Sequence, residues 1–462
     1  MADAPYIAPE QEPSLLNAGL LACIATAALA GLLFGFDTAV ISGTTDALTR
    51  IFDLSPTWLG ITVSSALVGT LIGALTAGYP GDRYGSRNTL RVLASFYIVA
   101  GIGCAFAWSW GSLVGFRVLA GLAVGGSSVL APVYIAEVSP PSKRGQLVAA
   151  FQFMVIFGIL LAYVSNAIIA SLHLGDAEWR WKLGIAAIPA AVFMALLFRI
   201  PNSPRWLILR DRDEEAKTAL GRIGMDGPVA QKEIEAIHAS LDEQPGKETL
   251  SWTKHRKPIL LAMMVAGFNQ LSGINAFLYY LNDIFAKSSS ALSPDVQAVI
   301  IGIVNAVFTF VGMLLIDRLG RKTLLLIGSA GMAVCLTVGG LSLLGVLPTT
   351  LVLYALIGFI AFFAPSTGAV IWVYISEVFP TQVRSRGSAI GASTHWGSNA
   401  VIAAAFPAVA AWSAGAPFLF FAAMMVVQFF VVLTYFPETK GVSLERMREQ
   451  LGLKPGEALS AG

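Results

Sequence analysis

The sequence predicts an all-α, polytopic membrane protein whose twelve transmembrane helices form two pseudo-symmetric six-helix bundles. Three observations support this fold class. Of the 462 residues, 56% are hydrophobic and only 13% are charged, whereas about a quarter of the residues in a soluble domain are charged. Apolar runs of membrane-spanning length recur along the chain, and motifs of its first half return in its second half.

Twelve apolar runs reach the roughly 20 residues that a helix needs to cross the hydrocarbon core of a bilayer. The predicted spans are residues 17–42, 57–79, 91–109, 112–134, 147–171, 182–200, 258–285, 296–317, 323–346, 350–375, 386–411 and 416–436. Only the connection between the sixth and seventh spans is long. It leaves six predicted spans on each side.

This long connection is rich in charge. Its segments "RDRDEEAKTALGRIG" from Arg210 and "PVAQKEIEAIHASLDEQ" from Pro228 have helical spacing, so we expect short amphipathic helices in water there. The predicted units are an N-terminal tail (1–16), a first six-helix bundle (17–200), a linker (201–257), a second six-helix bundle (258–437) and a C-terminal tail (438–462).

Basic residues in the short loops indicate the topology. One side of the membrane receives Arg83, Arg87, Arg91, Lys143, Arg144, Arg318, Arg321, Lys322, Arg384 and Arg386, and the other receives Arg50, Arg180, Lys182 and Lys287. The positive-inside rule therefore puts the linker and both termini in the cytoplasm. The N-terminus lacks the basic start and cleavage site of a secretory signal, so we expect a multi-pass protein of the bacterial inner (plasma) membrane that keeps this segment.

The sequence lacks the motifs and composition that are typical of several functional classes. The net charge of +2 does not suggest a nucleic-acid partner, and Cys23, Cys104 and Cys335 lie far apart in apolar runs, which favours core packing over a disulfide or a metal site. The motifs HExxH, GxSxG and GxxxxGK[ST] do not occur, so an enzyme or an ATP-driven pump is not expected. We expect a monomer in the lipid bilayer, without cofactor or metal.

Three pairs of motifs repeat between the halves. "PGDRYGSRNTL" is echoed by "IDRLGRKTLL", "VYIAEVSPPSKRG" by "VYISEVFPTQVRSRG", and "PNSPR" by "PETKG". Their spacings are 235 residues (Asp82 to Asp317), 240 residues (Glu137 to Glu377) and 236 residues (Pro201 to Pro437). Motifs kept in order at nearly one spacing indicate a duplicated six-helix unit, a recurrent design among transporters.

The repeated loops predict a cytoplasmic gate made of ion pairs. Its residues are Asp82, Arg83, Arg87, Glu137 and Arg144 in the first half, and Asp317, Arg318, Arg321, Lys322, Glu377 and Arg384 in the second half. Acids and bases at matching loop ends could close the inner side in one state and separate in another. The alternative is a set of solvated loops whose ion pairs contribute under about 1 kcal/mol each.

Taken together, the motifs "DRYGSR", "DRLGRK", "PNSPRW", "NQLSGINAFLYY" and "PETKG" resemble those of the sugar porter branch of the major facilitator superfamily. The resemblance runs from Leu32 to Gly441. It implies the major facilitator fold and transport of a monosaccharide by alternating access, with a cytoplasmic latch at the repeated loops. The sequence departs from the family pattern at Ser86, Asn202 and Asn269.

Asp37 is a carboxylate within the first predicted span. A charge at membrane depth costs about 2.5 to 3.5 kcal/mol on insertion scales, so it needs a partner, water or a function. Arg117 is the only basic residue well inside another span of this half, and we expect the two side chains to face each other. Proton symporters of the family resemble this chain in having aspartate here, which implies a proton-coupling role. Alternatively, Asp37 reaches water at the outer interface, close to Ser42.

Polar side chains in the apolar spans form the candidate sugar site: Gln152, Asn269, Gln270, Asn275, Asn305, His395 and Asn399. Amides donate and accept hydrogen bonds without charge, which suits a sugar. The resemblance assigns sugar contacts to the positions of Gln152, Asn269, Gln270, Asn275 and Asn305. The alternative is that these groups bond between helices, which contributes about 0.6 kcal/mol on average. Ser272 and Gly273 interrupt the seventh span, so we expect a helix break there.

Aromatic side chains complete the predicted site. Phe34, Trp372 and Trp396 could pack against the C–H face of a sugar, with Tyr279 and Tyr280 as an outer gate and Tyr280 also counted as a sugar contact. The alternative is interfacial anchoring or core packing. The resemblance implies amides where this sequence has His395 and Ile159, and we expect His395 to form neutral hydrogen bonds.

These residues together predict a secondary active transporter that imports a hexose or pentose with a proton. One alternative is a facilitator that moves sugar without protons. Another is a transporter-like sugar sensor, although the 22 residues from Gly441 to Gly462 form only a short tail.

Overall fold

The structure is a computed structural model that describes residues 17–140, 143–242, 250–380, 383–440 and 442. Its regular elements in the first half are α1 (Ala18–Val40), η1 (Ile41–Gly43), α2 (Thr45–Phe52), α3 (Pro56–Thr76), α4 (Gly78–Tyr84), α5 (Ser86–Ala105), α6 (Trp110–Val138), α7 (Arg144–Ser171), η2 (Gly175–Ala177), α8 (Glu178–Gly184) and α9 (Ala187–Leu197). The linker forms α10 (Pro204–Ile208), α11 (Asp213–Arg222) and α12 (Pro228–Asp242). The second half forms α13 (Trp252–Leu271), α14 (Ile274–Tyr279), α15 (Leu281–Ala286), α16 (Pro294–Leu319), α17 (Arg321–Leu343), α18 (Leu351–Phe363), η3 (Ala364–Gly368), α19 (Ala369–Glu377), α20 (Arg384–Trp412) and α21 (Ala416–Tyr435).

The predicted all-α membrane fold is confirmed. Within the described residues, eleven helical segments are long and apolar enough to cross a membrane. The twelfth predicted span, 386–411, is helix α20, which is not among the eleven but has 29 residues. The amphipathic helices predicted in the linker are also confirmed as α11 and α12.

The seventh predicted span breaks where the sequence indicated. Helix α13 ends at Leu271 and α14 begins at Ile274, and Gly273 between them has a φ of +85°, a conformation that favours glycine. The predicted range 258–285 extends beyond the helical segment that is long and apolar enough to cross a membrane, because that segment ends at Tyr279 and the short helix α15 follows a second break at Tyr280.

Two other spans differ from the prediction. The tenth is interrupted by η3, a π-helical turn that contains Pro365, a residue without the N–H that a regular helix would use. The sixth begins at Gly175 instead of residue 182 and consists of η2, α8 and α9 in succession. The π-helical turn matters for function because residues of η3 line the central cavity.

We expect Gly273→Ala to destabilise the protein by about 1 kcal/mol or more. Alanine disfavours the positive φ, and its Cβ would lie 2.3 Å from the Phe421 ring, which must shift. The matched control is Gly267→Ala, because a Cβ at Gly267 in helix α13 meets open space. Thermal unfolding in detergent checks this, and equal melting temperatures for the two variants would contradict it.

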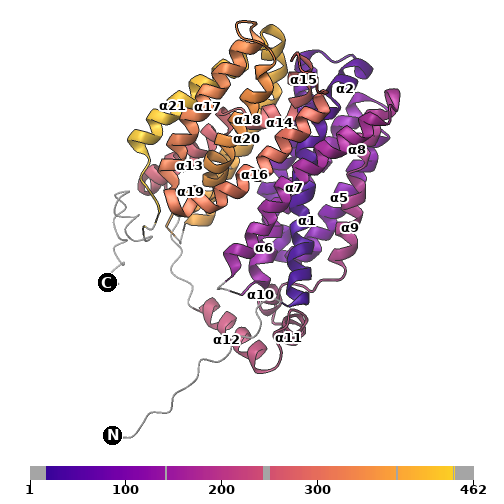
Figure 1. The fold of residues 1–462 in the computed structure, drawn as a ribbon. Helices are drawn as coiled ribbons and strands as arrows, with labels where there is room; N and C mark the ends of the chain where they lie inside the picture. Colours follow the sequence, from indigo (N-terminus) through magenta and orange to yellow (C-terminus); the bar gives the residue numbers. More distant parts are fainter. Residues whose placement is uncertain (1–16, 141–142, 243–249, 381–382, 441, 443–462) are drawn as a thin grey trace.

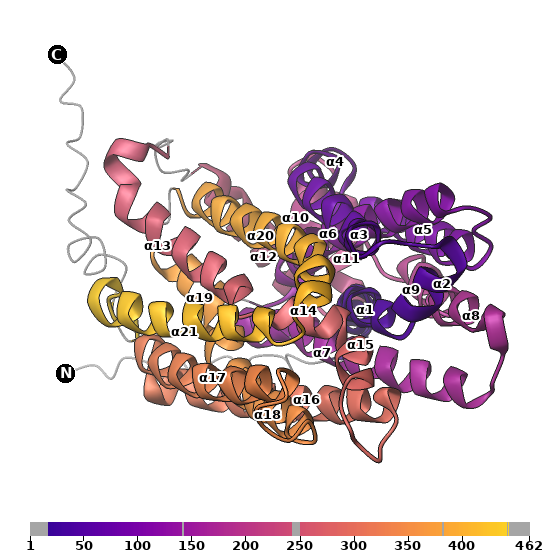
Figure 2. The same ribbon diagram turned by 90° about the horizontal axis from the view of Figure 1, so that it is seen from above.

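The helices gather into two bundles that meet along a few helix pairs. Helices α1 to α9 form one group and α13 to α21 the other, as Figures 1 and 2 show. The groups touch through α3 with α20, α7 with α16, and α14 with α1. A Cβ at Gly60 of α3 would lie 2.0 Å from the carbonyl oxygen of Ala404 on α20, so glycine allows the close approach of these two helices.

The two ends of the molecule differ. The linker helices α10 to α12 lie at one end, which we call the linker end, whereas α2 and α15 lie at the other, which we call the far end (Figure 1). The short elements η1 and α15 of the two bundles contact each other at the far end.

Candidate functional site

A central cavity of about 140 Å³ lies between the bundles. Eight of the predicted sugar-site residues line it: Phe34, Gln152, Asn269, Asn275, Asn305, Trp372, His395 and Trp396. They come from α1, α7, α13, α14, α16, α19 and α20, so both bundles contribute to one chamber. The cavity wall from α7 is apolar apart from Gln152, because Val155, Ile156 and Ile159 follow it.

Gln270 is the centre of a buried hydrogen-bond network behind the cavity wall. Its Nε2 lies 3.1 Å from Asn269 Oδ1 and 3.1 Å from the ring nitrogens of His395. Its Oε1 accepts a hydrogen bond of 3.0 Å from Asn275 Nδ2. Because the three partners line the cavity, Gln270 fixes the orientation of the groups that face a ligand.

Aromatic rings form a second wall. The His395 ring lies 5.1 Å from that of Trp372 and 5.0 Å from that of Trp396, and Phe34 of the other bundle lies 5.6 Å from Trp396. These distances are within the range of favourable ring contacts. The wall therefore joins the two bundles through apolar faces.

The structure separates the two adjacent tyrosines. Tyr279 lines the central cavity, and its hydroxyl accepts a 2.9 Å hydrogen bond from Asn399 Nδ2. Tyr280 instead lines a pocket at the far end and donates to the carbonyl oxygen of Ala403 at 2.9 Å. Asn399 thus reaches the cavity through Tyr279, whereas Tyr280 is not among the residues that line it.

Sequence reasoning missed Thr38 and Thr309, which also line the cavity. Each is an isolated hydroxyl residue in an apolar run, and this was the available signal. The Thr38 hydroxyl donates to the backbone carbonyl of Phe34 at 2.9 Å. Its oxygen is still able to accept a hydrogen bond from a ligand.

The structure brings Asp37 and Arg117 together. Arg117 Nη1 lies 2.9 Å from Asp37 Oδ1, and their side chains are 4% and 18% exposed, respectively. Arg117 Nε has no hydrogen-bond partner among the described residues. The pair is therefore a nearly buried charge pair with donor capacity to spare on the arginine.

This pair is next to the central cavity. A small chamber that contains Asp37 and Arg117 is also lined by Phe34, Thr38, Tyr279 and Trp396. All four of these residues line the central cavity as well. A ligand that moves this shared wall therefore changes the surroundings of the charge pair.

The second-half loop cluster is tightly paired. Arg321 bonds to Glu377 at 2.9 Å and to Asp317 at 3.0 Å. Glu377 also accepts a 2.6 Å hydrogen bond from the Thr439 hydroxyl, and Glu438 accepts one of 2.9 Å from the backbone N–H of Arg321. These contacts link α16, α17, α19 and the segment after α21. The basic groups of Lys322 and Lys440 bond to the carbonyl oxygens of Leu433 and Arg318.

The first-half cluster is paired differently. Ser86 opens α5 as Arg321 opens α17, and its hydroxyl lies 3.5 Å from Glu137. Arg87 donates instead to the carbonyl oxygen of Ile200 at 2.8 Å. A serine cannot supply the charge that Arg321 brings to Glu377, so the two copies are unequal. Arg144 and Arg384 stand at the starts of α7 and α20.

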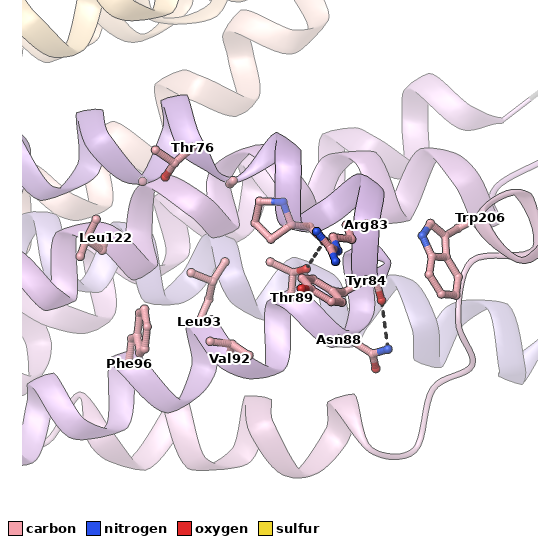
Figure 3. A pocket seen from close by; sticks show the side chains of 13 residues that line it. Thr76, Arg83, Tyr84, Asn88, Thr89, Val92, Leu93, Phe96, Leu122 and Trp206 are labelled. Carbon is pink, nitrogen blue, oxygen red and sulfur yellow. Dashed lines mark hydrogen bonds between the residues drawn. The ribbon is translucent and has the colours of Figure 1, made fainter. Parts of the chain in front are cut away.

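Arg83 faces a separate pocket of about 710 Å³ on the first bundle (Figure 3). Arg83 Nη1 donates to the Tyr79 hydroxyl at 2.9 Å, and Trp206 of α10 donates to the carbonyl oxygen of Asp82 at 2.9 Å. The rest of this pocket is lined by residues of α3, α4, α5 and α6, among them the apolar side chains of Val92 and Phe96. The linker thus packs against the loop that carries Asp82 and Arg83.

These groups offer hydrogen bonds, ring faces and one buried charge pair. Within the described part of the chain, no group of three or more His, Cys, Asp or Glu side chains could hold a metal ion. The central chamber suits a small neutral molecule rich in hydroxyl groups.

The fold and this chamber define a polytopic helical membrane protein with a ligand cavity between two bundles. The sequence model of the family described as "Sugar (and other) transporter" matches residues 23–451, and the chain belongs to this family. The match confirms the resemblance noted from the motifs. The chain is 34% identical to the D-xylose-proton symporter of Escherichia coli K12, over 91% of this chain and 93% of the relative. It is 35% identical to the arabinose-proton symporter of Bacillus subtilis 168, over 94% and 95%.

Solved structures agree with this membership. The inward open conformation of the xylose transporter XylE from E. coli matches with a TM-score of 0.84 and 33% identity, over 93% of this chain and 99% of that one. The proton:xylose symporter XylE bound to 6-bromo-6-deoxy-D-glucose matches with a lower TM-score of 0.74 and 33% identity, over 94% and 99%.

Proposed function

We propose that this protein imports a monosaccharide together with a proton by alternating access. One observation carries the proposal: the Asp37–Arg117 pair lies in a chamber that shares four wall residues with the central cavity. The relatives named for proton-coupled transport of xylose and arabinose support it. The substrate is a hexose or a pentose.

The sugar binds in the central cavity. Gln152, Asn269, Asn275, Asn305 and His395 face its hydroxyl groups, and Gln270 and Asn399 hold the groups that make contact. Phe34, Trp372 and Trp396 pack on its C–H faces. Neutral amides and an uncharged imidazole can exchange hydrogen bonds with a sugar without placing a net charge in the membrane.

Asp37 is the proton-coupling group and Arg117 its partner. When Asp37 is ionised, the pair is neutral; when it takes up a proton, Arg117 leaves one net positive charge in the site. The membrane potential acts on that charge, at about 2.3 kcal/mol per 100 mV. Sugar binding against Phe34 and Trp396 couples to this step because both residues also border the charge pair.

We infer that the linker end is cytoplasmic and that the conformation faces inward. The excess of basic residues at that end and the higher TM-score to the inward open relative support this. Each bundle moves as a unit, and the loop clusters form the cytoplasmic gate. In this state the second-half cluster keeps its ion pairs within its own bundle. Both termini are cytoplasmic, and the protein is a monomer in the bacterial inner membrane.

Sugar-induced proton movement into proteoliposomes tests this function. Purified protein is given xylose, arabinose, glucose, galactose or fructose while the external pH is recorded. We expect at least one sugar to alkalinise the medium outside. Sugar entry without a pH change would make the protein a facilitator, and sugar binding without entry would favour the sensor interpretation.

A further inference from the structure

A charged pocket of about 630 Å³ lies between the bundles at the far end. The first bundle lines it with η1, α2, α3 and α8, and the second with α15, α16 and α20. Its charged residues are Asp46, Lys182, Asp283, Lys287 and Asp295, and Tyr280 also lines it. The function proposed above gives none of these side chains a role.

Contacts across this pocket join the two bundles. The Thr45 hydroxyl of α2 donates a 2.9 Å hydrogen bond to Asp283 Oδ1 of α15. Lys182 of the first bundle is 3% exposed, and its Nζ contacts Glu178 Oε1 at 2.6 Å and the carbonyl oxygen of Gly43 at 2.9 Å within that bundle. Across the pocket, the same Nζ lies 4.0 Å from Asp295 Oδ1 of the second bundle. The far end is therefore closed by polar contacts that must separate when it opens.

Asp283 is an acid that this closure partly buries. It follows the membrane-spanning segment that ends at Tyr279, and it is surrounded by groups of both bundles. Burial, together with the like charge of Asp46, raises the pKa of Asp283 to about 6, against the lowering effect of the Thr45 hydrogen bond and of Lys287. Lys182 and Asp295 are the remaining charged residues that line the pocket, and their charged groups lie 4.0 Å apart. Glu178, at 2.6 Å from Lys182 Nζ, is the nearest partner of that lysine.

We propose that Asp283 is a second proton-binding carboxyl, and that a proton bound there stabilises the closed form of the far end. Opening separates α2 from α15 and exposes the carboxylate to water, where it ionises more readily. Burial in the closed state raises the free energy of the ionised carboxylate, and this cost is absent in the open state. Lowering the pH from above 6 toward 4 removes that penalty, so acid favours closure.

The expected size of the pH effect on closure follows from the pKa of Asp283 in the closed and in the open form. With a closed-state pKa of about 6 and an ordinary value near 3.9 in the open state, the closed-to-open ratio rises about tenfold from pH 7.5 to pH 5. Acid outside the cell would thus close the far end over a bound sugar. The closure step would consume a proton from the same side as the one proposed for Asp37.

Distance measurement between spin labels at the far end tests the proposal. The labels are attached to Thr57→Cys and Ala291→Cys, two exposed positions on different bundles, after Cys23, Cys104 and Cys335 are replaced by alanine. We expect the ratio of the short-distance to the long-distance population to rise about tenfold between pH 7.5 and pH 5. Asp283→Asn keeps an oxygen acceptor but cannot ionise, so it should hold the acid-state ratio at both pH values.

Two further variants should shift the pH midpoint of the closed-to-open transition in opposite directions. Thr45→Val removes the donor that favours the ionised carboxyl, so the midpoint should move to higher pH. Asp46→Asn removes a like charge, so the midpoint should move to lower pH while the transition persists. A pH response that survives Asp283→Asn, or a wild type without a response, would overturn the proposal.

Because this role rests on the proposed alternating access, the same labels are also recorded in an Asp37→Asn background. The readout needs no sugar and no proton flux. A response that persists there while the proteoliposomes show no symport would reject only the proposed function. Symport with no response of the far end to pH would reject only the role of Asp283.

Discussion

Replacing Asp37 by asparagine is expected to abolish accumulation of sugar against a gradient while leaving sugar exchange across the membrane intact. For one co-transported charge, an imposed potential of 100 mV supports an accumulation of roughly 50-fold in the wild type. In Asp37→Asn the accumulation ratio should fall to one. This is the largest functional change that we expect from a single substitution in the chain.

The geometry of the charge pair explains why sugar exchange is expected to persist in Asp37→Asn. Asparagine keeps an oxygen at the position of Asp37 Oδ1, so Arg117 Nη1 retains a hydrogen-bond acceptor at 2.9 Å. Removing the acceptor altogether would strand a nearly buried guanidinium, which costs about 3 to 5 kcal/mol in comparable buried pairs. The asparagine variant resembles the protonated state of the pair. It can complete the sugar cycle but cannot take up or release the proton.

Counterflow and uptake assays in the same proteoliposomes separate these outcomes. Counterflow of labelled sugar reports exchange, and uptake driven by a potassium diffusion potential reports accumulation. The control is Asp176→Asn, because Asp176 pairs with Arg50 at 2.8 Å on the exposed surface and has no place in the central chamber. Continued accumulation by Asp37→Asn would remove Asp37 from the coupling role, and loss of both activities would make it a structural residue.

Membrane spans could be predicted from the sequence because spanning is a local property of run length and composition. The break at Gly273 was equally local, since a small polar pair interrupts an apolar run. The π-helical turn at Ala364–Gly368 was not predicted. Pro365 is a signal for a break, but the kind of turn depends on how α16 and α17 pack against it.

The Asp37–Arg117 contact could be anticipated because Arg117 is the only basic residue well inside another span of the first half. The roles of Tyr279 and Tyr280 could not be separated in the same way. Neighbouring residues on a helix point about 100° apart, so the two tyrosines can face different surroundings. The second break, at Tyr280, decides which one faces the cavity, and the single span predicted over 258–285 did not include that break.

The inequality of the two loop clusters was visible in the sequence as Ser86, but its consequence needed the structure. Arg321 gathers Asp317 and Glu377 into one network of ion pairs, whereas Glu137 contacts the hydroxyl groups of Ser86 and Ser203. The linker instead stabilises the first-half loop through Trp206. The two copies of the duplicated motif therefore form different sets of contacts.

Replacing Gln270 by alanine is expected to weaken sugar binding by roughly tenfold to 100-fold. The substitution removes hydrogen bonds to Asn269, Asn275 and His395 and leaves their buried polar atoms without these partners. One buried group left unsatisfied costs about 1 to 3 kcal/mol, and each 1.4 kcal/mol is tenfold in affinity, so the expected loss corresponds to about one such group, with water serving the others. The cavity-lining groups also lose their orientation, so the loss appears in the dissociation constant.

Isothermal titration of the purified protein with the sugar identified in proteoliposomes measures this effect. The matched control is Gln297→Ala, since Gln297 is also fully buried in a helix but bonds only to the local carbonyl oxygen of Leu292, near the far end. Its dissociation constant should stay within about twofold of wild type, as expected for a site that does not touch the ligand. Equal losses in both variants would point to general destabilisation, and no loss in Gln270→Ala would exclude the network from the sugar site.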